Sequence, residues 1–197
     1  MGEPLLFDPL AGLVAKAGRG DKAAASALVT AVSPALWRIA WRLLRDAAEA
    51  EDVTQEALIR MWKIAPVWQT GRAKFETWLY KITTNLCFDR LRKAGRFVEE
   101  GAGTEPIDPS PLPDAGILAT HVRARIDAAL AGLPDRQRTA IILTHFESLP
   151  AKAAGEILGL SVDGFESLLS RGRKALRAAL ADDKHELLEA ARQGNVA

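Results

Sequence analysis

Apolar residues recur every three or four positions through most of this chain, which is the spacing of one face of an α-helix. Residues 48–64 show the pattern most clearly. Their stripe of small and apolar side chains consists of Ala50, Val53, Ala57, Met61 and Ile64. The same spacing predicts helices over 75–93 and 117–131, and shorter helices within 8–45 and 135–146. No segment alternates with the period of two that is typical of a strand, so the pattern predicts an all-α fold.

Turn and cap residues predict where several helices begin and end. A break is expected at 18–20, where two glycines occur, and Asp21 is then a candidate N-cap. Ser33 followed by Pro34 predicts another helix start, because serine is a good N-cap and proline is favoured at the first helical position. Pro66 is expected to end the helix over 48–64.

Residues 149–176 have the pattern of a helix-turn-helix. Gly159 stands where the first helix must stop, because glycine adopts the left-handed conformation at little cost, and Ser161 can then cap the second helix. The helix before the motif is expected to direct Phe146 inward. The second helix ends in a basic cluster formed by Arg171, Arg173, Lys174 and Arg177. Such a helix suits the DNA major groove, although a plain helical hairpin with a solvated basic end gives the same pattern.

Residues 95–116 break the periodicity. The stretch 95–115 holds four prolines, three glycines and five acidic residues, a composition that cannot bury a core. We therefore predict a flexible linker between two small helical bundles, of which the second contains the helix-turn-helix. The bundles are residues 1–94 and 117–180, followed by a charged tail at 181–197.

Composition limits the functions that the chain can have. It has 197 residues and a formal net charge of only +1, with two mildly basic blocks separated by the acidic linker. Few phosphates can be neutralised, so the free protein is expected to bind DNA poorly. The lone Cys87 excludes an internal disulfide and any multi-cysteine zinc site, and a buried inert thiol is the favoured interpretation.

No motif of catalysis is present in the sequence. It has no glycine-rich phosphate loop, no histidines at metal-ligand spacing and no nucleophile motif, so we expect no enzyme activity, no cofactor, no metal and no small-molecule substrate. The first residues do not have the pattern of a signal peptide, and no run approaches the roughly 18 apolar residues of a membrane span. A cytoplasmic protein is the expectation.

Two surfaces remain ambiguous from the pattern alone. The acidic face of the helix over 48–64 is either a solvated face or a docking surface for a basic partner, and the solvated face is favoured. In the loop over 66–74 and the helix over 75–93, aromatic, amide and basic residues interleave, with an exposed Trp68 expected in the loop. That mixture suits single-stranded nucleic acid, but Trp78 and Phe88 can equally be core residues.

Four segments together carry a resemblance to a known family. They are AEAEDVTQEALIRMW, FETWLYKITTNLCFDRLRK, LAGLPDRQRTAIILTHFESLP and AGEILGLSVDGFESLLSRGRKAL. In this order, on both sides of a linker, they resemble the bacterial RNA polymerase sigma factors of the extracytoplasmic-function (ECF) type in the sigma-70 family. Residues 1–94 would be region 2, which binds core polymerase and melts the downstream promoter element. Residues 117–180 would be region 4, which reads the upstream element in duplex form.

The resemblance assigns roles to residues. Core RNA polymerase would dock on Asp52, Gln55 and Glu56. The downstream element, with one base flipped out of its stack, would be contacted by Trp68, Arg72, Lys74, Trp78, Lys81, Asn85 and Arg92. The upstream element would be contacted by Ser161, Ser167, Arg171, Arg173 and Lys174. The resemblance also implies an anti-sigma partner, often membrane-linked and tied to a stress response.

The chain departs from the family at several positions. Basic residues are common early and midway in the recognition helix, where this sequence has Glu166 and Leu168. Gly164 and Gly172 each weaken that helix by up to about 1 kcal/mol relative to alanine. Ala153 and Ala154 are small for the first helix of the motif.

These departures keep two other functions open. One alternative is a stand-alone helix-turn-helix regulator that acts without polymerase. The other is an adaptor that still binds polymerase or an anti-sigma partner but no longer reads DNA.

Overall fold

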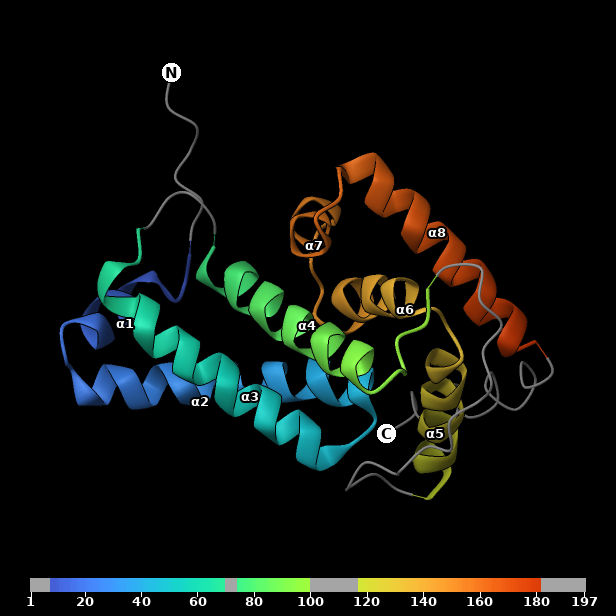
Figure 1. Cartoon of the computed structure of the whole chain (residues 1–197), viewed down its shortest axis with the longest axis horizontal. Coiled ribbons are helices and arrows are strands. Elements are labelled where there is room, and N and C mark those ends of the chain that lie inside the picture. Colours follow the sequence, from blue (N-terminus) through green and yellow to red (C-terminus); the bar gives the residue numbers. More distant parts are fainter. Residues whose placement is uncertain (1–7, 70–73, 100–116, 182–197) are drawn as a thin grey trace, which may run out of the picture.

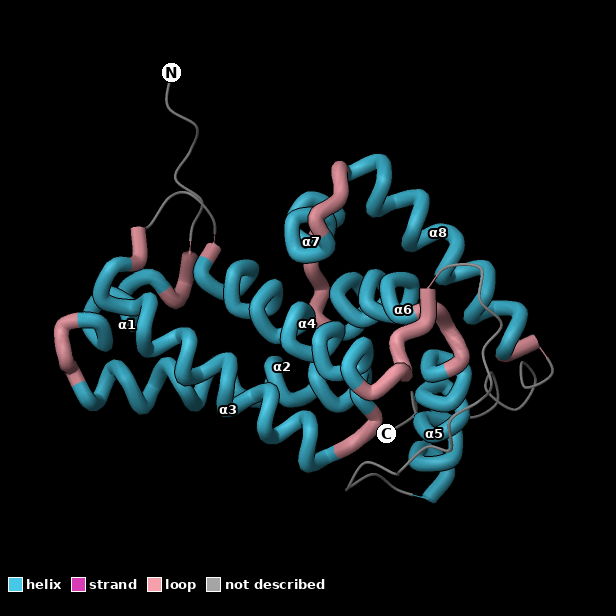
Figure 2. The backbone as a smooth tube through the Cα atoms, in the orientation of Figure 1, coloured by secondary structure: helices cyan, strands magenta, loops and turns pink. Residues whose placement is uncertain are grey.

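The computed structural model describes residues 8–69, 74–99 and 117–181, with the backbone alone for 117–123. Its helices are α1 (Ala11–Gly18), α2 (Lys22–Leu44), α3 (Ala47–Ile64), α4 (Phe75–Lys93), α5 (Ile117–Ala131), α6 (Asp135–Ile141), α7 (Ala151–Leu158) and α8 (Val162–Ala179). A 3₁₀ turn, Ala65–Val67, follows α3, and a π-helical turn, Ile142–Phe146, follows α6. The described residues form helices and loops without a strand (Figure 2), which confirms the all-α prediction.

Helices α1 to α4 form the first module, and aspartates cap three of them. Asp21 accepts hydrogen bonds from the first turn of α2 as predicted, and Asp46 accepts one from the Glu49 N–H of α3. The N–H of Phe75, at the start of α4, donates to Asp8 Oδ2 at 2.8 Å. The cap of α4 thus comes from a residue far away in sequence. Because Asp8 lies just before α1, this hydrogen bond connects the start of α1 to the N-terminus of α4.

Helix α2 runs unbroken through Pro34, so the predicted helix start at Ser33 is wrong. The Ser33 hydroxyl bonds back to the Val29 carbonyl at 2.7 Å instead of capping a new helix. By length and composition alone α2 could cross a membrane. Its apolar residues are the core of the first module, however, and Leu28, Leu36 and Ile39 are fully buried.

Helices α5 to α8 form the second module, which contains the predicted helix-turn-helix. Gly159 has φ 67° and ends α7 in the left-handed conformation, and the Ser161 hydroxyl accepts from the Gly164 N–H. Gly172 is buried where α8 crosses α6, and a Cβ atom there would lie 3.2 Å from the Gln137 carbonyl oxygen. The glycine that weakens α8 therefore permits a close helix crossing.

Phe146 does not point inward as predicted. Its side chain is 37% exposed, and its ring lies under the Arg42 guanidinium of the first module at 4.0 Å. The π-helical turn from Ile142 to Phe146 changes the helical phase after the buried Ile141, so an extrapolated 3.6-residue period places Phe146 wrongly.

The two modules pack against each other through α4 and α7. Figure 1 shows α4 between α2 and α3 on one side and α6 and α7 on the other, with α8 on the outer edge. Helix α4 is consequently buried around most of its circumference, including the polar Thr83 and Thr84. The small residues of α7, among them the buried Ala154, allow this packing of α7 against α4. One continuous core extends through both modules.

Candidate functional site

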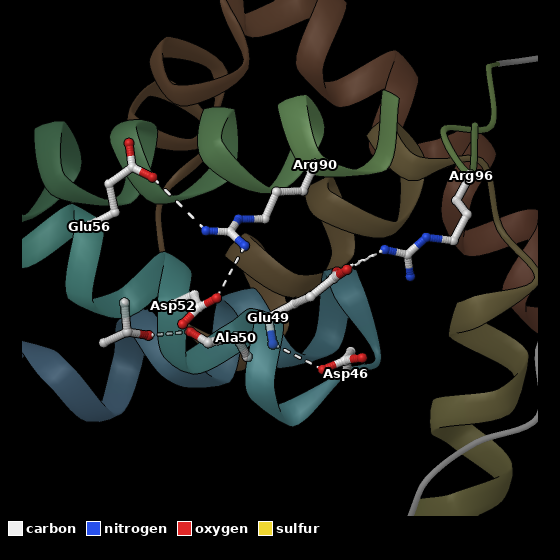
Figure 3. Close-up of polar contacts among 8 residues, drawn as sticks. Asp46, Glu49, Ala50, Asp52, Glu56, Arg90 and Arg96 are labelled. Atoms are coloured by element: carbon white, nitrogen blue, oxygen red, sulfur yellow. Dashed lines mark hydrogen bonds and ion pairs between the residues drawn. The ribbon is translucent and has the colours of Figure 1, made fainter. Parts of the chain in front are cut away.

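Three carboxylates lie in a row along α3: Glu49, Asp52 and Glu56, which we call the acidic row. Their spacing places them on one side of the helix, facing the C-terminal part of α4 (Figure 3). Arg90 of α4 lies between two of them, with Nη1 at 3.6 Å from Asp52 Oδ2 and Nη2 at 4.0 Å from Glu56 Oε2. Arg96 pairs with Glu49 through one nitrogen that lies 2.9 and 2.7 Å from the two carboxylate oxygens.

The acidic row is therefore partly neutralised within the protein, yet it stays accessible. The Asp52 side chain is 66% exposed and that of Glu56 41% exposed, and Glu56 also pairs with Arg60 at 2.6 Å. Ion pairs at such exposed positions are weak, so an incoming cation can replace Arg90 at little cost. Asp52 and Glu56 thus form charge pairs within the protein, and their side chains also remain accessible to solvent.

Gln55 is exposed and lines a groove of about 630 Å³ between α2 and α3. The side chains of Trp37 and Arg38 on α2 and of Glu51 on α3 also line this groove. A partner that contacts Asp52 and Gln55 together would therefore span α3 and reach α2.

An aromatic cluster lies at the N-terminal end of α4. Trp68, from the loop after α3, packs edge-on to Phe75 with ring centroids 4.9 Å apart and lies 5.6 Å from Trp78. Phe75 is fully buried, whereas Trp68 and Trp78 are half-buried. The prediction of an exposed Trp68 is therefore wrong, because Phe75 and Trp78 cover one side of it. The cluster therefore leaves parts of the Trp68 and Trp78 side chains accessible at the surface of the first module.

The outer face of α4 carries the other predicted contacts of the first module. Lys81, Asn85 and Arg92 are all exposed, and Lys74 is exposed just before the helix. Arg92 is held by Asp89 at 3.1 Å, and its guanidinium lies 5.5 Å from the centre of the Phe97 ring. Arg72 lies outside the described residues. Phe88 is buried against Phe97, so it belongs to the core and not to this face.

The predicted contacts of the second module lie along the exposed side of α8. Ser167, Arg171 and Lys174 are exposed, while Phe165 and Leu168 are buried on the opposite side. The Arg173 Nε donates to His145 Nε2 at 3.2 Å. Ser161 is exposed, but its hydroxyl is engaged as the helix cap. Leu168, a departure noted in the sequence, is thus a core residue, which explains why no basic side chain stands there.

Comparison with known families matches both modules. Residues 28–97 match the family model described as Sigma-70 region 2, and residues 123–176 match the one described as Sigma-70, region 4. The ECF RNA polymerase sigma factor SigW of Bacillus subtilis is 34% identical over 174 residues, which span 83% of this chain and 92% of that protein. This chain belongs to the ECF sigma factors of the sigma-70 family. The resemblance to ECF sigma factors that the sequence showed is thereby confirmed.

Two solved structures resemble this sigma factor over most of its length. One is CnrH in complex with the cytosolic domain of CnrY, with a TM-score of 0.67 and 26% identity over 89% of this chain and 99% of that chain. The other is the sigma factor RpoE in complex with the anti-sigma factor NepR from Bartonella quintana, with a TM-score of 0.62 and 28% identity over 78% of this chain and 94% of that chain.

Charged residues form ion pairs across the interface between the two modules of this sigma factor, which the sequence analysis did not predict. We call this set of ion pairs the seam. Arg38 and Arg42 lie in the C-terminal half of α2, and Arg45 follows directly as the C-cap of this helix. Arg38 pairs with Glu147 at 3.1 Å, and Arg45 lies 3.7 Å from Asp127. A basic stripe at the end of an otherwise apolar helix was the available signal for this seam.

Burial changes the pKa values of the seam residues. It raises the pKa of Glu147, although the hydrogen bond and charge of Arg38 oppose the change. It lowers the pKa of Arg45, against the attraction of Asp127. The charged forms of Glu147 and Arg45 therefore lose hydration at the interface between the modules. Their partners, Arg38 and Asp127, offset only part of that loss.

The deepest charged pair is Asp135 with Arg138, at the start of α6. The Arg138 Nη2 donates to Asp135 Oδ1 and, at 3.0 Å, to the Leu43 carbonyl oxygen at the end of α2. Desolvation raises the pKa of Asp135 and lowers that of Arg138, and the attraction between the two charges opposes both changes. This pair links a helix start in region 4 to a helix end in region 2.

Cys87 is fully buried on α4, and desolvation raises the pKa of its thiol well above the usual range. Because the thiolate is the reactive form, this cysteine is protected from oxidation in the folded protein. The expectation that this thiol is buried is confirmed, and its inertness stays a prediction.

Proposed function

We propose that this protein binds core RNA polymerase and directs it to specific promoters, without catalysis of its own. The observation that carries the proposal is that a region 2 match and a region 4 match share one chain, each on a folded module with its predicted contact side chains mostly exposed. The region 2 match accounts for the first module as more than a dimerisation or ligand unit, so the stand-alone regulator is not favoured.

Docking on polymerase would use the acidic row together with Gln55. The row offers carboxylates held in place by Arg90, and the adjacent groove offers the apolar surface of Trp37. A basic and partly apolar helical surface on the enzyme would complement both. The resemblance to sigma factors supports the clamp helices of the largest polymerase subunit as that surface.

Promoter reading would be divided between the modules. The aromatic cluster and the outer face of α4 would hold unpaired bases of the downstream element, where Trp78 supplies stacking and Lys81 attracts phosphate. The exposed side of α8 would enter the major groove of the upstream element through Ser167, Arg171 and Arg173. Glu166 is exposed on that side as well, so the upstream sequence that is read would differ from one read by a wholly basic helix.

Control by an anti-sigma protein forms part of the proposal. CnrH and RpoE, which this chain resembles over both modules, were solved with the cytosolic domain of CnrY and with the anti-sigma factor NepR. We propose a cytoplasmic sigma factor whose release from such a partner answers a stress signal.

Replacing both Asp52 and Glu56 by alanine is expected to weaken binding to core polymerase by about 10-fold to 100-fold, because two carboxylates of one interface are lost. The measurement is the Kd for purified core enzyme by fluorescence anisotropy. The matched control is Glu156→Ala, which removes an exposed carboxylate on α7, outside the acidic row and outside the groove. Equal affinity of the double variant and the wild type would reject the docking assignment.

A further inference from the structure

Glu166 is an exposed carboxylate on the side of α8 that faces away from the core. Its neighbours Phe165 and Leu168 are buried within the second module, and α8 itself lies on the outer edge of the molecule (Figure 1). Among the described residues, Glu166 has neither a hydrogen bond nor an ion pair. Both of its carboxylate oxygens can therefore accept hydrogen bonds from a bound molecule.

The cations of α8 all follow Glu166 along the helix. The stretch from Val162 to Ser170 has no lysine or arginine, and the exposed cations begin at Arg171. Arg173 lies seven residues after Glu166, which is about two turns further on the same side of the helix. Its Nε donates to His145 Nε2 at 3.2 Å, so the π-helical turn before the motif holds this guanidinium in place. The exposed side of α8 thus presents an acceptor first and cations afterwards.

This order of charges limits what Glu166 can face on a duplex. In a helix-turn-helix, residues near the N-terminus of the second helix contact base edges, while cations bind phosphates and fix the register. Glu166 is in the second turn of α8, within the part that contacts bases. A carboxylate is repelled by phosphates and by acceptor atoms of bases. It fits only where the groove presents a hydrogen-bond donor.

Two bases present a donor in the major groove, cytosine through its N4 amino group and adenine through its N6 amino group. In adenine the acceptor N7 lies beside N6 and repels a carboxylate, and guanine presents two acceptors there. Cytosine has no acceptor of its own in the major groove. A carboxylate therefore selects cytosine, whereas lysine or arginine in the same place would select guanine, which reverses the base pair.

We propose that Glu166 is a specificity-determining residue that selects a cytosine in the upstream promoter element by accepting a hydrogen bond from its N4 amino group. The proposal rests on the function proposed above. The acidic residue, which stands where a basic one is common in the family, then exchanges the preferred base and does not abolish DNA reading. The cations from Arg171 onward supply the phosphate contacts that hold Glu166 against this base.

The test uses core polymerase reconstituted with the full-length protein. A genomic promoter from which the wild type initiates is randomised in its upstream element, and the templates that yield transcripts are sequenced. The variants are Glu166→Ala and Glu166→Gln. Glutamine keeps the length and helix propensity of glutamate, but it pairs best with adenine. The matched control is Glu156→Gln, which removes an exposed carboxylate from α7 in the same module.

We expect the wild type to prefer cytosine at one position of one strand by about 5-fold to 100-fold, as for a directly read base pair. Glu166→Gln should exchange this cytosine for adenine on the same strand. Glu166→Ala should lose the preference there and use templates with other bases at least as well as the wild type, because no carboxylate then faces an acceptor. Other positions should keep their bases, and Glu156→Gln should keep all of them.

The proposal is overturned if Glu166→Gln retains the wild-type base at every position, or if the position that changes is not a C·G pair in the wild type. Weaker binding of Glu166→Gln to core polymerase with unchanged base preferences would assign the carboxylate to a protein contact and also overturn it. If the wild type initiates from no genomic promoter, the proposed function fails before the library is built. The two failures are therefore distinguishable.

Discussion

Replacing Arg138 with methionine is expected to lower the free energy of unfolding by about 3–5 kcal/mol, because the buried Asp135 carboxylate then has no neutralising charge. Arg138 is 4% exposed, and it also donates to the carbonyl oxygens of Ala131 and Leu43. Methionine fills a similar volume, so the loss measures the charge and the hydrogen bonds more than a cavity. Urea denaturation followed by circular dichroism gives the free energy.

Two further variants test whether the stability lost in Arg138→Met comes from the unpaired charge of Asp135. Adding Asp135→Asn should restore part of the stability, because the remaining buried group is then neutral. Arg177→Met, an exposed substitution on α8, should change the free energy by less than about 0.5 kcal/mol. A loss below about 1 kcal/mol for Arg138→Met would show that Asp135 is hydrated or protonated at little cost.

Replacing Phe75 with alanine is expected to cost about 3–5 kcal/mol of stability through the cavity it leaves. The functional effect should be larger than this loss alone predicts. Phe75 is fully buried and supports Trp68 at 4.9 Å and Trp78 at 5.6 Å, so both indole rings lose the surface that orients them. Binding of a single-stranded downstream promoter element by the complex with polymerase is the measurement, with an expected loss of at least about 10-fold.

The matched control for Phe75→Ala is Phe165→Ala, which empties an equally buried position in the helix-turn-helix. It should cost a similar free energy of unfolding while the single-stranded element is still bound. If both variants bind the single strand equally well, the aromatic cluster is not the surface that holds the unpaired bases.

The helices could be predicted from sequence because local rules determine them. The stripe from Ala50 to Met61 is buried as its period requires, and Gly159 and Ser161 end and cap helices as predicted. The failures occurred where a distant contact overrides the local rule. Helix α2 continues through the exposed Pro34, against the usual cost of an interior proline, because Leu28 before it and Leu36 and Ile39 after it are buried in the same core.

The packing of one module on the other was beyond prediction from the chain. It joins Arg38 to Glu147 and Arg45 to Asp127, pairs separated by 109 residues in the first case and placed on different modules in both. Charged residues at helical spacing are compatible with a solvated face as well as with a seam. The polar Thr83 and Thr84, both fully buried, give no apolar signal that α4 is covered on two sides.

In the candidate site too, the local pattern predicted some residues, whereas others depend on contacts between distant parts of the chain. The pattern placed Asp52 and Glu56 on the polar side of α3, and only the resemblance to sigma factors gave that side a role. Arg90 and Arg96, which pair with the acidic row, lie some 40 residues further along the chain, and the sequence analysis assigned a role to neither of them. Their roles follow from the packing of α4 on α3, which no local period encodes.

The most direct test of the central claim is transcription in vitro with purified core polymerase that lacks a specificity subunit. Genomic promoter fragments from the source organism serve as templates. We expect transcripts with defined start points that appear only when this protein is added, and that are lost with the variant lacking Asp52 and Glu56. Binding of the protein to promoter DNA without polymerase, and no transcript in its presence, would contradict the account.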